Sequence, residues 1–288
     1  SRPAVAWTVH NARLELRADQ LPGRRWLLRP KRQAYRTLYR RGSRIAHFVA
    51  VSDDVADAVR ATVRPPSGHL HTIPNGVDVH RYGRADRSAM RRELGIPDDA
   101  AVVMCVAKML EQKGHRVLVE ALAAPEVADL PLRVLLVGDG PLRKEIEDRA
   151  RRAEVWDRIR FLGNRPDVPR LLAAADIFVL PSLWEGLPIA LLEAMAAGLP
   201  SVATAVSGTR QVLTDEENGL LVPPDDAGAI AAAVARLVRH RELRDALGAA
   251  ARQHVLAEFS VDRQAARHVE LYRAITGSEG VAARQEGT

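Results

Sequence analysis

The sequence has a single cysteine, few aromatic residues and no long apolar run. Aromatic side chains make up 4% of the 288 residues, and Cys105 stands inside the apolar segment AVVMCVAKML. One cysteine excludes a disulfide framework and a cysteine-based metal cluster, so we interpret it as a core residue of a protein from a reducing compartment. Because no stretch of eighteen apolar residues occurs, the pattern predicts no membrane-spanning helix. We therefore expect a cytoplasmic protein.

Acidic residues are scarce near the start of the chain. Residues 1–64 carry 14 Lys and Arg against 5 Asp and Glu, although the net charge of the whole chain is only +6. Nine of these basic residues, and no acidic one, lie in residues 21–44, where Tyr35, Leu38 and Tyr39 fall on one helical face. Such a helix favours peripheral contact with an anionic membrane or a lipid-linked acceptor, and a solvated face explains it equally well. The arginines lack the spaced aromatic platforms of nucleic-acid-binding proteins, so we expect no nucleic-acid partner.

Short apolar segments alternate with helical patterns along the chain. This alternation predicts βαβ units and parallel sheets covered by helices, which is an α/β fold. The expected strands lie in residues 3–10, 45–52, 69–76, 101–109, 132–140, 159–164, 176–182, 200–204 and 219–224.

A segment rich in Pro, Gly and charge, residues 75–99, interrupts the alternation. We expect residues 1–99 to hold an acceptor-side Rossmann-like domain with its linker, and residues 100–255 to form a second, doubly wound domain that binds the donor nucleotide. The first domain has only two or three strands and opens inside one, so we expect its front half to precede Ser1. A C-terminal helix over 256–276 and a disordered tail over 277–288 complete the expected organisation.

Residues 181–200, PSLWEGLPIALLEAMAAGLP, carry the clearest chemical signal. Pro188 and Gly198 favour a helix over about 188–197, which leaves Glu185 just before its start. Free backbone N–H groups at a helix start favour an anion, and Glu193, in the first two turns, is suited to accept hydrogen bonds from sugar hydroxyls. On spacing alone, a capping acid and a surface glutamate explain the same pair.

Two lysines follow the first expected strand of the second domain. In AKMLEQKGH, Lys108 and Lys113 lie on a loop where two ammonium groups would neutralise a diphosphate, although surface lysines are common. The turn VGDGP over 137–141 is not the G-x-G-x-x-G fingerprint and disfavours a nicotinamide site. The sequence also has no Asp-x-Asp motif and no cluster with metal-ligand spacing, so we expect no metal.

Together these segments resemble the retaining glycosyltransferases of the GT-B fold, family four, also called glycosyl transferases group 1. The Glu-x7-Glu pair within residues 181–200 is the most specific element. The resemblance implies two Rossmann-like domains that face a cleft, the first one incomplete. It also implies hexosyl transfer with retention, without a metal or cofactor, from a nucleotide-diphosphate donor to a hydroxyl of a glycan or lipid-linked glycan. The segments that carry it are TVHN, VAVS, IPNGVD, AKMLEQKG, LLVGDGP, FLGN, PSLWEGLPIALLEAMAAGLP and NGLLVPP.

The resemblance assigns roles to the residues around the helix start. Glu185 would contact the transferred sugar, and the backbone of Gly186, Leu187 and Pro188 would touch sugar and phosphate. Glu193 would hold the ribose hydroxyls of the donor.

The remaining assignments fall on other segments. Lys113 matches the phosphate-binding lysine of the family, and Lys108 stands where an arginine is usual, which keeps the charge and loses the bidentate fork. Gly163 and Asn164 would lie beside the nucleobase. His10 matches a histidine that reaches towards the sugar from the first domain, although a lone histidine at a strand end is more often structural.

Two alternative functions stay open at this stage. A non-catalytic nucleotide-sugar-binding fragment would use the same donor residues without transfer. A GT-B-type nucleotide-sugar epimerase would share the fold, although the EGLP context favours transfer.

Overall fold

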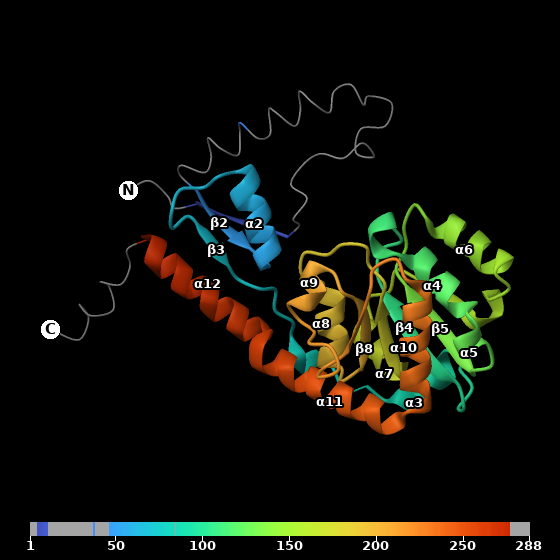
Figure 1. The fold of residues 1–288 in the computed structure, drawn as a ribbon. Coiled ribbons are helices and arrows are strands. Elements are labelled where there is room, and N and C mark those ends of the chain that lie inside the picture. Colours follow the sequence, from blue (N-terminus) through green and yellow to red (C-terminus); the bar gives the residue numbers. More distant parts are fainter. Residues whose placement is uncertain (1–4, 11–36, 38–45, 84, 277–288) are drawn as a thin grey trace. The chain divides into compact units, whose positions relative to one another are not determined.

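The described part of the chain holds nine strands in two parallel sheets. The computed structural model describes residues 5–10, 37, 46–83 and 85–276, and each expected strand segment contains one observed strand. The predicted α/β class is therefore confirmed. The chain divides into two compact units, one of residues 1–75 with 262–288 and one of residues 76–261 (Figure 1).

The first unit is built on a three-stranded parallel sheet in the order β1-β2-β3. Val49 and Ile73 of this sheet segment pack against Leu271 of the last helix in a small apolar core. Ser52 caps the helix over residues 53–62, because its hydroxyl accepts a hydrogen bond from the Val55 N–H. The elements are β1 (Val5–Val9), β2 (Ala46–Ala50), α2 (Asp53–Thr62), β3 (Leu70–Thr72) and α12 (Val261–Thr276).

The second unit is built on a six-stranded parallel sheet in the order β6-β5-β4-β7-β8-β9. Since β4 is the first of these six strands along the chain, this is the 3-2-1-4-5-6 order of a doubly wound domain, and its switch point lies between β4 and β7. Its strands are nearly all buried, and Cys105 in β4 is a core residue whose thiol pKa burial raises to about 12. The strands are β4 (Ala101–Val106), β5 (Leu132–Val137), β6 (Ile159–Gly163), β7 (Ile177–Leu180), β8 (Ser201–Thr204) and β9 (Leu220–Val222).

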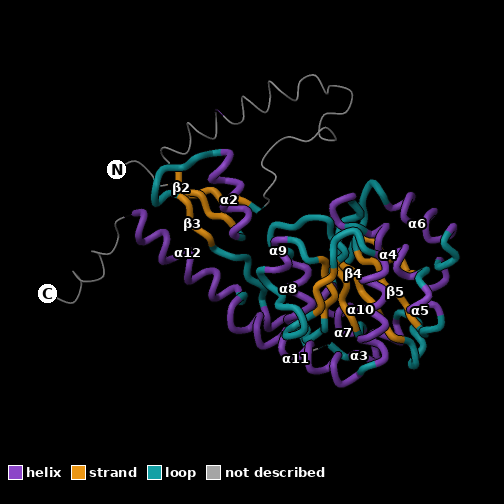
Figure 2. Tube along the Cα trace, in the orientation of Figure 1, coloured by secondary structure: helices purple, strands orange, loops and turns teal. Residues whose placement is uncertain are grey.

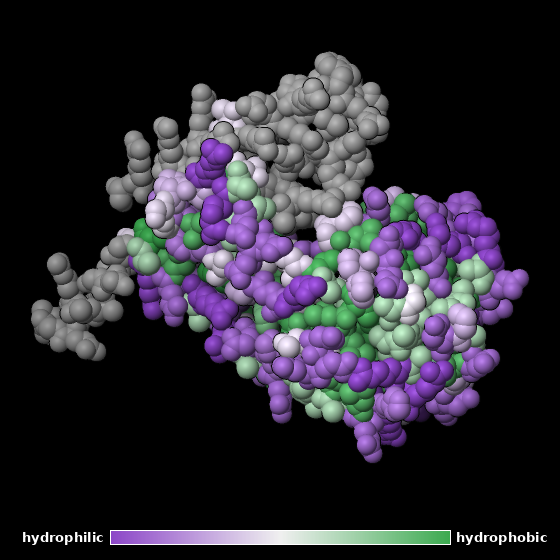
Figure 3. Space-filling model, in the orientation of Figure 1, coloured by the Kyte–Doolittle hydropathy of each residue, from purple (hydrophilic) through white to green (hydrophobic). Residues whose placement is uncertain are grey.

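Helices surround this sheet (Figure 2). Contacts join α4 to α6 and α10, α8 to α11, and α3 to α7. The sequence of α6, RKEIEDRARR, buries only Ile146 and Ala150, and hydrophilic residues fill the visible surface where it lies (Figure 3). The helices are η3 (Val79–Arg81), α3 (Arg87–Glu93), η4 (Glu111–Lys113), α4 (His115–Leu122), α5 (Pro125–Ala128), α6 (Arg143–Arg152), η5 (Trp156–Arg158), α7 (Val168–Ala174), α8 (Ile189–Ala196), α9 (Ser207–Arg210), α10 (Ala227–Arg239) and α11 (Arg241–Glu258).

The boundaries of the compact units differ from those expected. Residues 76–99 belong with the second unit, because Arg91 of α3 is buried there and its guanidinium pairs with Asp176 beside β7. The expected helix over 256–276 is divided between α11, which ends at Glu258, and α12, which belongs to the first unit. The expected tail, residues 277–288, lies outside the described residues.

The helix after β7 begins one residue later than expected. Pro188 has an extended ψ of 109° and is the residue before the first helical one, so α8 runs from Ile189 to Ala196. Glu185 still precedes the helix, and Glu193 is its fifth residue.

Two loops at the carboxyl edge of the second sheet approach each other closely. Gly114 has a left-handed φ of 62°, and a Cβ at this position would lie 1.9 Å from the carbonyl oxygen of Pro181. The N–H of Leu183 donates to the carbonyl of Gln112 over 2.7 Å, which joins the same two loops. Only glycine fits at Gly114, since any side chain there would separate the loop after β4 from the loop after β7.

We expect Gly114→Ala to lower the free energy of unfolding by about 2–5 kcal/mol. The left-handed conformation contributes about 1–2 kcal/mol, and overpacking against Pro181 adds about 1–3 kcal/mol. Gly95→Ala is the control, because Gly95 also has a positive φ, of 56°, but the nearest atom to its added Cβ is Arg160 Nη1 at 4.0 Å. Urea unfolding of both variants measures the difference, and equal losses would contradict the close approach of the loops.

Candidate functional site

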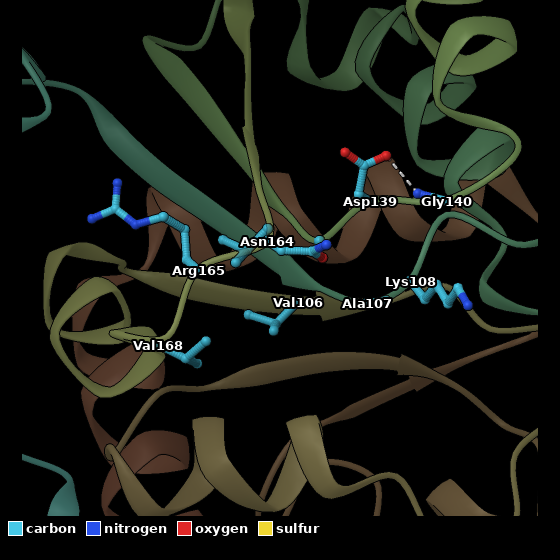
Figure 4. Close-up of a pocket in the computed structure, with 10 residues that line it drawn as sticks. Val106, Ala107, Lys108, Asp139, Gly140, Asn164, Arg165 and Val168 are labelled. Carbon is cyan, nitrogen blue, oxygen red and sulfur yellow. Dashed lines mark hydrogen bonds between the residues drawn. The ribbon is translucent and has the colours of Figure 1, made fainter.

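A cavity lies at the carboxyl ends of three neighbouring strands of the second sheet. It has a volume of about 580 Å³ and opens beside the loops that follow β4, β5 and β6. In Figure 4, Val106 and Asn164 lie between Arg165 on one side and Lys108 on the other. Ligands of doubly wound sheets bind at this edge, and the volume is within the range of small-molecule sites. The lining residues are Val106, Ala107, Lys108, Val137, Gly138, Asp139, Gly140, Asn164, Arg165 and Val168.

The cavity wall carries two fixed charged groups besides Lys108. The guanidinium of Arg165 donates two hydrogen bonds of 2.7 Å to Asp167, which holds its plane in one orientation. Asp139 accepts from the Gly140 N–H at 2.7 Å and from Arg143 at 3.0 Å, and these bonds lower the pKa of its carboxyl. Among the described residues, no carboxylate forms an ion pair with Lys108, so its charge is available to an anion.

A buried carboxylate, Glu185, is held by three donors on the loop after β7 and the loop after β4. Its side chain lies 2.5 Å from Lys113 Nζ, and it accepts from Ser182 Oγ at 2.7 Å and from Gln112 Nε2 at 3.4 Å. Glu185 is only 8% exposed. An ion pair this buried is maintained because the surrounding hydrogen bonds offset the cost of removing both charges from water. Neighbouring His115 is buried, and burial and Lys113 together lower its pKa to about 4, so its ring is neutral.

Buried hydroxyl groups hold the Glu185 loop from beneath. Thr209 Oγ1 donates to the carbonyl of Thr204, and Thr204 Oγ1 donates to the carbonyl of Ser182. Ser182 Oγ then donates to Glu185, so the backbone of β8 and α9 is connected to the carboxylate. The α9 helix also approaches closely, because a Cβ on Gly208 would lie 2.1 Å from the carbonyl oxygen of Gly186.

The second carboxylate, Glu193, points from α8 to a tyrosine far away in sequence. Tyr82 Oη donates to Glu193 Oε1 over 2.8 Å, and Tyr82 is 3% exposed. Burial raises the pKa of the Glu193 carboxyl, whereas the Tyr82 hydrogen bond and nearby Arg81 lower it. The pKa of Tyr82 is raised as well, by burial and by Glu193, so its phenol stays a hydrogen-bond donor.

Two family models match the chain and show the family to which it belongs. The family model "Glycosyl transferases group 1" matches residues 86–254, and the model "Glycosyltransferase Family 4" matches residues 1–81. The chain belongs to the group 1 glycosyltransferases.

Several known proteins are similar to it in sequence. N-acetyl-alpha-D-glucosaminyl L-malate synthase of Bacillus anthracis is 29% identical over 223 residues, which cover 77% of this chain and 58% of that protein. A GDP-mannose-dependent monoacylated alpha-(1-6)-phosphatidylinositol monomannoside mannosyltransferase of Corynebacterium glutamicum is 35% identical over 200 residues, which cover 65% of this chain and 52% of that protein. The chain thus spans little more than half the length of these relatives.

Solved structures share the fold. Anabaena HepE in complex with UDP-glucose matches with a TM-score of 0.81 and 23% sequence identity, over 95% of this chain and 73% of that one. At that identity the likeness concerns the fold alone. It confirms the GT-B fold that the resemblance implied.

The donor residues expected in this group 1 glycosyltransferase all belong to the second unit. Lys108 and Asn164 line the cavity, Lys113 meets Glu185, and Gly163 ends β6 with a φ of 66°. Leu187 is buried just before α8, between Gly186 and Pro188, and Glu193 follows within the helix. His10 is exposed after β1 in the first unit. The roles assigned to these residues stay predictions.

The sequence interpretation missed five residues that the structure brings to this edge. Gln112 lies in AKMLEQKGH and Ser182 in PSLWEGLPIALLEAMAAGLP, but polar residues near a glutamate give no separate signal. Asp139 lies in VGDGP, whose pattern indicates only a turn. The remaining two are Tyr82 and Arg165.

In the part of the chain that the structure describes, no three His, Cys, Asp or Glu side chains are grouped as metal ligands would be. Among the same residues, no helix is both long enough and apolar enough to cross a membrane.

We expect Glu193→Gln to stabilise the protein, increasingly so as the pH rises. A carboxyl whose pKa is raised in the folded state contributes stability below its unfolded pKa and loses that contribution as the pH rises through the folded pKa. Glutamine keeps an oxygen that accepts from Tyr82 and carries no charge to desolvate. Urea unfolding at pH 5 and pH 7.5 should give a larger gain in unfolding free energy at pH 7.5, and a gain independent of pH would contradict the burial of the charge.

Proposed function

We propose that this chain transfers a hexose from a nucleotide-diphosphate donor to a hydroxyl of a glycan or lipid-linked glycan, with retention and without a metal. One observation carries the proposal. At the carboxyl edge of the six-stranded sheet, a cavity that holds Lys108 adjoins the loop of Lys113, whose ammonium group meets the buried Glu185 just before α8. Cations, a helix start and buried acceptors are together the groups that a nucleotide sugar requires.

The diphosphate of the donor would be neutralised by the protein alone. Lys108 supplies an ammonium group that pairs with no carboxylate of the described residues, and the N–H groups at the start of α8 supply the positive end of a helix dipole. Lys113 is paired with Glu185 in the structure without donor, so donor binding would place its ammonium group between the carboxylate and a phosphate oxygen. Removing one such contact to a developing anion raises the barrier by about 2.7–4 kcal/mol.

The bond changes of the proposed reaction are confined to donor and acceptor. The acceptor oxygen forms a bond to the anomeric carbon as the bond from that carbon to the diphosphate oxygen breaks. The acceptor proton moves to the departing phosphate on the same face, which gives retention. Glu185 is buried and already bound by Lys113 and Ser182, so it orients the sugar and its partners instead of attacking the anomeric carbon.

The proposal also includes His10, the basic segment 21–44 and the acceptor. His10 would approach the sugar from the first unit. Peripheral contact with an anionic membrane through residues 21–44 stays a prediction, because all of that segment except Thr37 lies outside the described residues. The C. glutamicum relative is named for a lipid-bearing acceptor and the B. anthracis relative for malate, so both acceptor types occur among similar proteins.

We expect Lys113→Ala to weaken donor binding 10- to 100-fold. Titration calorimetry in EDTA with UDP, GDP and ADP sugars should show wild-type binding to one donor, and loss of a charge-assisted contact costs about 1.5–3 kcal/mol. Lys144→Ala is the control, because Lys144 is 85% exposed on α6 and pairs with Asp148. Lys113→Arg should recover part of the affinity. Wild-type binding to none of the sugars, or equal affinity in Lys113→Ala, would overturn the proposed donor site.

We expect the product to keep the anomeric configuration of the donor. Proton NMR of the product formed with a panel of glycan and lipid-linked hydroxyl acceptors measures this directly, since the coupling at the anomeric proton distinguishes the two configurations. Inversion would exclude the proposed same-face route. Donor binding without any transfer would favour the non-catalytic fragment, and conversion of the donor sugar without an acceptor would favour an epimerase.

A further inference from the structure

Tyr82 lies in the segment that links the end of the first unit to α3. It directly follows the short helix η3, its backbone is extended with φ −112° and ψ 152°, and its side chain is 3% exposed. The Tyr82–Glu193 contact joins residues 111 positions apart in the sequence. A phenylalanine would fill the same buried volume, so the hydroxyl is the group whose presence needs an explanation.

The hydroxyl meets Glu193 with a geometry suited to orienting it. Oη lies 2.8 Å from Oε1, which is the length of a good hydrogen bond between a hydroxyl and a carboxylate. A carboxylate offers about four acceptor positions on its two oxygens, and the phenol occupies one of those on Oε1. The other oxygen, Oε2, accepts no hydrogen bond from the described residues, and it has acceptor positions for two adjacent hydroxyl groups of a ligand.

Other groups near Glu193 affect the charge of its carboxyl. Burial raises the pKa of this carboxyl, and Arg81, the residue before Tyr82, lowers it and so favours the charged form. Asp78, which caps η3, raises the pKa of Tyr82, and Arg81, the last residue of η3, lowers it. The hydrogen bond from Tyr82 is the one hydrogen bond that the Glu193 carboxylate accepts from the described residues, and it gives the side chain a direction.

We propose that Tyr82 is a positioning residue that fixes the Glu193 carboxylate so that it accepts hydrogen bonds from the ribose hydroxyls of the donor. The inference rests on the proposed function, because Glu193 has a ribose to bind only if the chain takes a nucleotide. Tyr82 itself touches no part of the donor and acts through Glu193.

The test compares nucleotides with and without the ribose hydroxyls. We measure calorimetric dissociation constants of UDP, GDP and their 2′,3′-dideoxy analogues for the wild-type chain, Tyr82→Phe and Tyr272→Phe. Tyr82→Phe should weaken UDP or GDP binding about 5- to 10-fold. This is the effect expected when Glu193 loses its hydrogen bond from Tyr82 but still reaches the ribose in part of the molecules. It should leave the dideoxy analogue unchanged. Tyr272, 47% exposed on α12, is the matched control and should change neither.

The pH dependence supplies a second readout that packing alone would not move. The Tyr82 hydrogen bond lowers the pKa of the Glu193 carboxyl, so its removal raises that pKa. The acidic limb of the binding curve for the ribonucleotide should therefore move to higher pH in Tyr82→Phe, while that for the dideoxy analogue should not.

The possible outcomes separate this inference from the function on which it rests. Equal weakening of both nucleotides by Tyr82→Phe, or no weakening of either, overturns the positioning role while wild-type binding upholds the donor site. Absence of wild-type binding to every nucleotide overturns the proposed function. The dideoxy analogue binds the same folded molecules, so its stoichiometry corrects each variant for its folded fraction.

Discussion

The parallel order of the six-stranded sheet is the constraint on which the site depends. Because every strand runs the same way, the loops after β4, β5, β6 and β7 all leave from one edge. The switch point between β4 and β7 then separates two of these loops, and the glycine contact of Gly114 with Pro181 brings them together again. Lys113 and Glu185 meet for this reason, although the residues between them form three strands and several helices.

The two carboxylates of the Glu-x7-Glu pair are held in different ways. Glu185 is paired with the ammonium group of Lys113 and accepts from hydroxyl and amide donors, so its charge is balanced within the protein itself. Glu193 has a neutral partner, Tyr82, and keeps a raised carboxyl pKa. In the proposed donor site, the ion pair of Glu185 would keep a bare negative charge away from the phosphates, which it would otherwise repel. Glu193 keeps an oxygen that could accept hydrogen bonds from uncharged hydroxyl groups of the donor.

The likeness to other group 1 glycosyltransferases agrees with this arrangement at the level of the fold and the family. The family model covers the whole six-stranded sheet, whereas the named relatives range from an N-acetyl-alpha-D-glucosaminyl L-malate synthase to a phosphatidylinositol monomannoside mannosyltransferase. The cavity wall with Arg165 and Asp139 belongs to the loops after β5 and β6, where small changes of side chain alter the shape of the cavity.

The sequence by itself determined the α/β class, all nine strand segments and the family, because alternating patterns and the EGLP context are local properties of the chain. It grouped the linker, residues 75–99, with the first domain and placed Pro188 inside α8. It also missed Tyr82, since these features depend on which distant segments pack together. Burial of Arg91 against Asp176 assigns residues 76–99 to the second unit. Only the tertiary structure decided that Lys113 pairs with Glu185 and Tyr82 with Glu193, because contacts 72 and 111 residues apart leave no periodic trace in a single sequence.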